Sequence, residues 1–182
     1  MNINKFIPLM CEKTIFDIDY IKLYESGKRY ILIDLDNTII PYDISMPDDK
    51  IKTYFEELKK IGFKIIIVSN NKEYRIKPFS EAVDVDYVYS AKKPLKCGLK
   101  KAYKKLGNKI NKDEILAIGD QIITDVFGAR RFKIDVILVH PIKKKSEKWY
   151  TRFNRKLENK VIKIMRKKNP EMYKEIMEKH EY

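Results

Sequence analysis

Four short runs of apolar residues constrain the fold of this 182-residue chain more than any other feature of its sequence. The runs YILI, IIIV, ILAI and VILV lie at 30–33, 65–68, 115–118 and 136–139. A strand that is apolar on both of its faces is typical of a parallel sheet with helices on both sides. We therefore predict buried strands over the following ranges: 30–35, 63–68, 114–119 and 135–139.

Segments with helical spacing separate these strands. Strands and helices that alternate at short intervals indicate an α/β fold, a three-layer, doubly wound (Rossmann-like) parallel sheet. Residues 6–27 predict a loop with a short helix. The remaining predicted elements are a short strand at 86–89 and helices over 47–60, 72–83 (interrupted by Pro78), 94–107 and 123–131.

The sequence divides into three parts: an N-terminal loop and short helix (1–29), a core (30–142) and a basic helical extension (143–182). Its two cysteines, Cys11 and Cys97, are too few for a disulfide framework or a zinc site, so we expect both to be reduced, as in a cytoplasmic protein. No segment has the roughly 18 unbroken apolar residues of a membrane span. We expect a cytoplasmic protein that attaches at most to the inner surface of a membrane.

Polar residues follow four of the predicted strands. In a doubly wound sheet, ligands bind beyond the carboxyl ends of the strands, so these side chains are expected to meet at one edge. They supply several carboxylates, hydroxyls, an amide and a lysine. In chain order they are Asp34, Asp36, Thr38, Ser69, Asn70, Lys92 or Lys93, Asp120 and Asp125.

The carboxylates in this set would repel one another unless a cation lay among them. All the proposed ligands are oxygen atoms, and there is no Cys or His cluster, so Mg²⁺ is the expected ion. A lysine and a hydroxyl next to such an ion suit a phosphate group. One carboxylate, Asp34, can be a nucleophile, and Asp36, two residues on, can protonate a leaving oxygen and later activate water.

Together these segments resemble the haloacid dehalogenase superfamily of Mg²⁺-dependent phosphatases. The family pattern matches DLDNT (34–38), Ser69, Lys93 and GDQIITD (119–125), in the family's order. A closer resemblance is to subfamily IIIA, which includes the YqeG-like and the mitochondrial phosphatidylglycerophosphate phosphatases. It covers most of the chain, through PLMCEKTIFDID, LIDLDNTIIPYD, IIIVSNN, AKKP, AIGDQIITDVFGARR and WYTRFNRKLENKV.

The resemblance implies a role for each matching residue. Lys93 matches the family lysine better than Lys92, because it directly precedes proline. The implied roles are Asp34 as nucleophile, Asp36 as acid/base with its carbonyl on the metal, Thr38 as a stiffener of the loop between them, Ser69, Asn70 and Lys93 as phosphate ligands, Asp120 as a metal ligand, and Asp125 as a direct or water-mediated one.

The cap domains that select substrates in this superfamily have no room in this chain. Only 30 residues separate Thr38 from Ser69, and 23 separate Ser69 from Lys93. We therefore expect an open site, which suits a large substrate or one presented by a surface. Tyr42 is a candidate for its lining, while roles for Gln121 and His140 stay open.

Most of the formal charge of +13 lies in one segment. Residues 143–168 hold twelve Lys or Arg against two Glu, a net of +10. Apolar residues recur there every four positions, which predicts an amphipathic helix that ends at Asn169-Pro170. Three interpretations stay open: a helix docked on the core with a solvated basic face, a helix that binds anionic lipid, or a contact with nucleic acid. The apolar residues are Trp149, Phe153, Leu157, Val161 and Met165.

The sequence as a whole predicts a Mg²⁺-dependent phosphomonoester hydrolase that acts through an aspartyl-phosphate. The resemblance implies phosphatidylglycerophosphate as a substrate, and the basic segment would place the open site at an anionic membrane. Three alternatives remain: a phosphatase for a small soluble metabolite, a phosphatase for nucleic-acid phosphate ends, and a non-catalytic module that binds polyanions.

Overall fold

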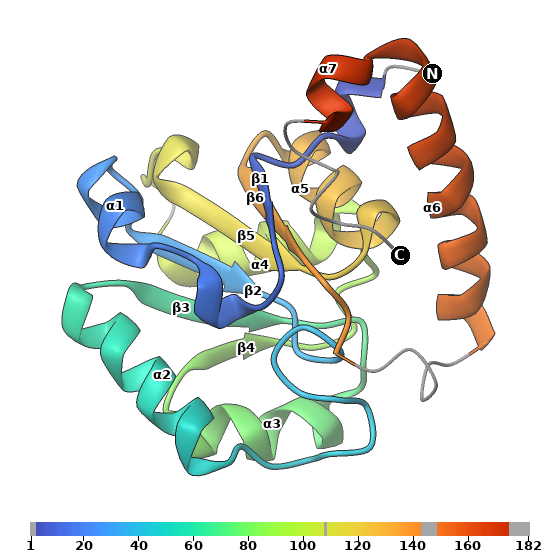
Figure 1. Cartoon of the computed structure of the whole chain (residues 1–182). Helices are drawn as coiled ribbons and strands as arrows, with labels where there is room; N and C mark the ends of the chain where they lie inside the picture. The colour runs from blue at the N-terminus through green and yellow to red at the C-terminus, as the bar shows by residue number, and fades with distance from the viewer. Residues whose placement is uncertain (1–2, 108, 143–148, 175–182) are drawn as a thin grey trace.

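The computed structural model describes residues 3–107, 109–142 and 149–174, with side chains from residue 157 onward in the last range. Its centre is a single sheet of six parallel strands in the order β1-β6-β5-β2-β3-β4 (Figure 1). This confirms the predicted α/β architecture. The strands are β1 (Met10–Glu12), β2 (Tyr30–Ile33), β3 (Lys64–Val68), β4 (Asp86–Val88), β5 (Ile115–Gly119) and β6 (Asp135–Val139).

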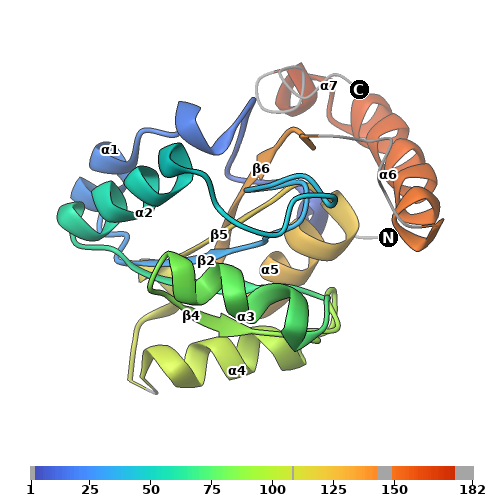
Figure 2. The same ribbon diagram turned by 90° about the horizontal axis from the view of Figure 1, so that it is seen from below.

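Helices cover both faces of the sheet, as strands with apolar residues at every position require. Alternate strand residues point to opposite faces, so Ile31 and Ile33 pack on one side and Leu32 on the other. Figure 2 shows the resulting layers from below. The first face carries α1 (Tyr20–Glu25), α2 (Asp49–Ile61) and α3 (Glu73–Ala82), and the second carries α4 (Lys96–Leu106), α5 (Phe127–Phe132) and α6 (Trp149–Lys168).

The sequence missed one strand, β1, inside the segment that predicted a loop and a short helix. The strand has only three residues, too few for a periodic pattern, and it pairs with β6 at the edge of the sheet. Its middle residue, Cys11, is buried. Short 3-10 turns also occur, at η1 (Ile3–Phe6), η2 (Ile15–Asp17) and η3 (Lys112–Glu114).

Two predicted helices differ in detail from the sequence pattern. Pro78 does not interrupt α3, which is held by the fully buried side chains of Ile76 and Phe79 on either side of it. The segment predicted as one helix over 123–131 begins as a π-helical turn, η4 (Ile122–Val126), and continues as α5. In the described chain there is no cap domain over the sheet edge.

The basic helix α6 is docked on the core along its described part. Val161 and Met165 are buried in the second apolar cluster, and the carboxylate of Glu158, also fully buried, accepts a hydrogen bond from the Ile123 amide (3.2 Å). Helix α6 ends at Lys168, directly before Asn169-Pro170, as its sequence predicts. Asn169 caps the short helix α7 (Pro170–Met172) that follows. Lys143–Lys148 and the side chains of Trp149 and Phe153 lie outside the described part of the chain. Among the described residues, no helix is long and apolar enough to cross a bilayer.

Candidate active site

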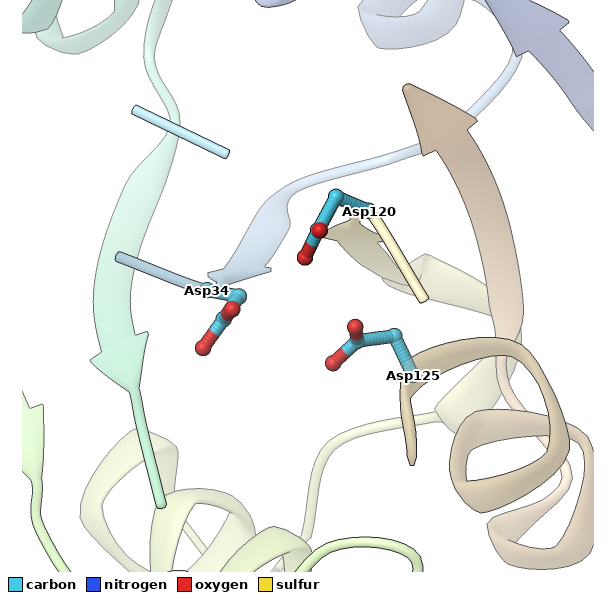
Figure 3. A group of neighbouring side chains, drawn as sticks. All are labelled: Asp34, Asp120 and Asp125. Atoms are coloured by element: carbon cyan, nitrogen blue, oxygen red, sulfur yellow. The ribbon is translucent and has the colours of Figure 1, made fainter. Parts of the chain in front are cut away.

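Three carboxylates meet at the carboxyl edge of the sheet, beyond the ends of two neighbouring strands (Figure 3). Asp34 directly follows β2, Asp120 follows β5, and Asp125 lies on η4. Each is buried, and one oxygen from each lies within 4.8 Å of the others. An all-oxygen set of this kind is what Mg²⁺ prefers, so the residues fit the expected metal. The sequence thus predicted both the members of this cluster and the edge where they meet.

The ammonium group of Lys93 lies between two of these carboxylates. Its Nζ atom is 2.6 Å from Asp34 Oδ1 and 2.7 Å from Asp125 Oδ1. Lys92, the other candidate, has an exposed side chain and a backbone φ of 55°. The geometry therefore selects Lys93. One buried ammonium faces three buried carboxylates, which leaves a negative excess that a divalent cation would offset.

Burial and charge perturb the titration of both partners in this pair. Loss of solvation raises the pKa of Asp34 well above its usual range, and the charges of Asp125 and Asp120 raise it further, while Lys93 opposes the shift. Burial alone would lower the pKa of Lys93, but the carboxylates of Asp125 and Asp34 outweigh it and raise that pKa. Lys93 is therefore charged at neutral pH.

Asp125 is held in place by its protein neighbours. Its Oδ2 accepts hydrogen bonds from the Gln121 amide (3.1 Å) and from Thr124 Oγ1 (3.2 Å), in addition to the Lys93 contact on Oδ1. The carboxylate packs directly against Gly119, where a Cβ atom would lie only 2.3 Å from Asp125 Cγ. The glycine that opens GDQIITD is thus required by the aspartate that closes it.

Asp36 points towards the start of α3, into a clamp that the sequence did not reveal. Its Oδ1 accepts hydrogen bonds from Arg75 Nη2 (2.8 Å) and Nε (3.1 Å), and its Oδ2 accepts one from Asn71 Nδ2 (2.8 Å). Asn71 also donates to the hydroxyl of Tyr42 (2.7 Å). Arg75 looks like an ordinary charged residue of an amphipathic helix in the sequence, so only the fold exposes its role.

The phosphate-ligand candidates surround a small cavity at the same edge. Asn70 fixes the lysine loop, because its Oδ1 accepts from the Lys93 amide (2.7 Å) and its Nδ2 donates to the Lys93 carbonyl (3.2 Å). The hydroxyl of Thr38 donates a hydrogen bond to Asp120 Oδ1 (3.4 Å). The cavity has a volume of about 190 Å³ and is lined by Asp34, Asp36, Asn37, Tyr42, Ser69, Asn70, Asn71, Lys93, Gln121 and Thr124.

The sequence left the roles of Gln121 and His140 open, and the structure places them in different depressions. Gln121 lines this catalytic cavity, at the start of η4. His140 does not line this cavity; it lines a second groove, together with Thr38 and Ile39. Tyr42 lines the cavity, as its position after Pro41 suggested.

Comparisons with known proteins agree with this geometry. A family model for haloacid dehalogenase-like hydrolases matches residues 5–133. The chain is 37% identical over 163 residues to the probable phosphatase YqeG of Bacillus subtilis, an alignment that covers 90% of this chain and 93% of that protein. An uncharacterized protein from Listeria monocytogenes shares the fold, with a TM-score of 0.51 at 18% identity over 66% of this chain and 85% of its own.

Replacement of Gly119 tests whether Asp125 serves the metal site. A methyl group in Gly119→Ala would push the Asp125 carboxylate away from Lys93, so we expect the Kd for Mg²⁺, measured by titration calorimetry, to rise about tenfold or more. Gly107→Ala is the control, since it strains a positive φ but meets no atom closer than 3.8 Å. Unchanged Mg²⁺ binding in Gly119→Ala would exclude Asp125 from the site.

Proposed function

The chain belongs to the haloacid dehalogenase-like hydrolases and is a phosphatase, and we propose that it hydrolyses a phosphomonoester through an aspartyl-phosphate on Asp34. The observation that carries this proposal is the position of Asp34. Its carboxylate lines the catalytic cavity, 2.6 Å from the Lys93 ammonium group and beside Asp120 and Asp125. A buried carboxylate in such surroundings is placed to attack a phosphoryl group.

In the proposed first step, an oxygen of Asp34 forms a bond to phosphorus and the ester oxygen leaves, taking a proton from Asp36. In the second step, Asp36 accepts a proton from water, which attacks the same phosphorus and frees both Asp34 and inorganic phosphate. Lys93 and Ser69 bind the phosphoryl oxygens during both steps. The residues that would hold Mg²⁺ are Asp34, Asp120, the Asp36 carbonyl and Asp125 (directly or through water), and the ion would offset the phosphoryl charge.

Substitution of the proposed nucleophile gives the first test. Asp34→Asn keeps the size of the side chain and removes one buried negative charge, so the protein should stay folded. We expect no Mg²⁺-dependent release of p-nitrophenol from p-nitrophenyl phosphate, because uncatalysed phosphomonoester hydrolysis is extremely slow. Circular dichroism checks the fold, and EDTA should abolish the wild-type rate. A near-wild-type rate in Asp34→Asn would contradict the mechanism.

Arg75 is proposed as a positioning residue for Asp36. Arg75→Ala removes both hydrogen bonds to Asp36 Oδ1, and we expect kcat for an alkyl phosphate to fall by about 10- to 100-fold, part of the contribution of a general acid. The rate with p-nitrophenyl phosphate should fall less, because its leaving group needs little protonation.

The conservative variant separates positioning from stability. Arg75→Lys keeps the positive charge and offers one donor nitrogen in place of two, so it should recover part of the alkyl-phosphate rate that Arg75→Ala loses. A purely structural role would lower the rates of both substrates in parallel and leave no difference between aryl and alkyl esters.

We further propose phosphatidylglycerophosphate as the substrate, reached in the cytoplasm at the inner face of an anionic membrane. The exposed face of α6 supports this proposal. Around the buried Glu158, Val161 and Met165, every described basic side chain of the helix is exposed, and such a row of cations attracts anionic lipid. These side chains are Lys160, Lys163, Arg166, Lys167 and Lys168.

Charge reversal on α6 tests the membrane contact. Lys163→Glu/Lys167→Glu should weaken co-sedimentation with phosphatidylglycerol vesicles at 0.1 M salt by about 10-fold or more, since each basic residue contributes about 1 kcal/mol. Lys100→Glu/Lys104→Glu, with the same spacing of exposed lysines on α4, is the matched control. Equal binding by both variants, or binding of RNA without binding of vesicles, would contradict the lipid contact.

A further inference from the structure

The large apolar side chains that are exposed gather at the catalytic edge of the sheet. Ten such side chains occur in the described chain, and six of them lie in the segments that run from the carboxyl end of a strand towards the next helix, on the side of the sheet where the active site lies. Phe16, Ile44, Met46 and Ile142 are among them, each between 42% and 48% exposed. These segments therefore present apolar side chains to solvent on the side of the sheet that carries the site.

A groove of about 710 Å³ lies within this edge, next to the catalytic cavity. Its walls come from residues 13–17 after β1, residues 38–39 after Asp36, residues 140–142 after β6, and Lys50 on α2. Phe16 and Ile142 give it apolar surfaces. Its volume is in the range of sites that bind small organic molecules, whereas the catalytic cavity, at about 190 Å³, is not.

The groove carries positive charge beside its apolar walls. Lys13 and Lys50 line it, and the Lys50 ammonium lies 3.9 Å from the centre of the Phe16 ring. The one carboxylate in the lining, Asp17, accepts hydrogen bonds from the Thr14 amide (2.8 Å) and hydroxyl (2.7 Å). Two ammonium groups against one carboxylate that is already hydrogen-bonded favour an anionic ligand.

Hydrogen bonds attach the groove to the catalytic loop. The amide of Ile142 donates a hydrogen bond to the carbonyl of Asn37 (3.0 Å), and the amide of His140 donates one to the carbonyl of Lys13 (3.2 Å). Asn37 lines the catalytic cavity, and Thr38, the next residue, lines the groove and donates to Asp120. The two depressions therefore adjoin across one turn of the chain.

We propose that this groove binds the leaving group of the substrate, an alcohol that carries a second anionic group on an apolar body. The proposal rests on the phosphatase function. The catalytic cavity, at about 190 Å³, is below the range of sites that hold a whole organic ligand. The leaving group must then extend over an adjoining surface, and the groove offers cations for an anion and apolar walls for a carbon skeleton. A phospholipid would use both features, whereas a soluble bisphosphate would use the cations alone.

Binding of the leaving group alone tests the groove without any cleavage step. The probes for titration calorimetry are dioctanoyl phosphatidylglycerol, at a monomeric concentration, and glycerol 3-phosphate. We expect Lys13→Ser/Lys50→Ser to weaken binding of the lipid probe about tenfold or more, and Phe16→Ser/Ile142→Ser to do the same. Lys60→Ser/Lys64→Ser, which removes two exposed lysines at the opposite edge of the sheet, should bind like the wild type.

Each outcome decides the proposal. Lipid binding that both groove variants weaken supports the proposal. Binding of glycerol 3-phosphate that only the lysine variant weakens, without lipid binding, overturns the apolar body of the leaving group and leaves a soluble bisphosphate as the substrate class. No binding of either probe, or equal affinity in the groove and control variants, overturns the groove. If the protein binds neither probe but hydrolyses p-nitrophenyl phosphate, the groove is wrong and the catalytic proposal stands. If it binds a probe but does not hydrolyse p-nitrophenyl phosphate, the catalytic proposal is wrong.

Discussion

The position of one ammonium group between two carboxylates governs this site. Lys93 contacts Asp34 and Asp125, so the ends of β2 and β5 can approach closely despite their negative charges. Such a buried cluster is unfavourable unless its charges are compensated. The surrounding structure serves that compensation: Asn70 fixes the lysine loop from β3, Gly119 makes room for Asp125, and Thr38 supports Asp120.

The two acidic residues of the DLDNT motif have different surroundings. Asp34 shares its charge with Lys93 and the other carboxylates, whereas both oxygens of Asp36 face donors from Arg75 and Asn71. In a protein whose described chain has no cap over the site, side chains of the core itself must orient the second aspartate. Arg75 and Asn71 are the groups in position to do so.

The sequence predicts the central strands and most of the site because both depend on local patterns. Runs such as IIIV are apolar on both faces, and every site residue except Lys93, which follows the short strand β4, comes after such a run. Features that depend on pairing between distant segments could not be predicted. Arg75 lies among exposed charges in α3, β1 is too short to show a period, and the groove forms only when the ends of β1, β2 and β6 come together.

The buried Glu158 links the basic helix α6 to the segment that carries one of the active-site carboxylates. Its carboxylate accepts the Ile123 amide at the first turn of η4, the same turn that carries Asp125. Removal of α6 would leave that amide without its acceptor and would uncover the part of the apolar core that Val161 and Met165 cover beside η1 and η4. The smallest unit able to fold with an intact catalytic edge therefore extends past the last strand, and a version of this chain shortened to the sheet and its five earlier helices would be a poor starting point for engineering.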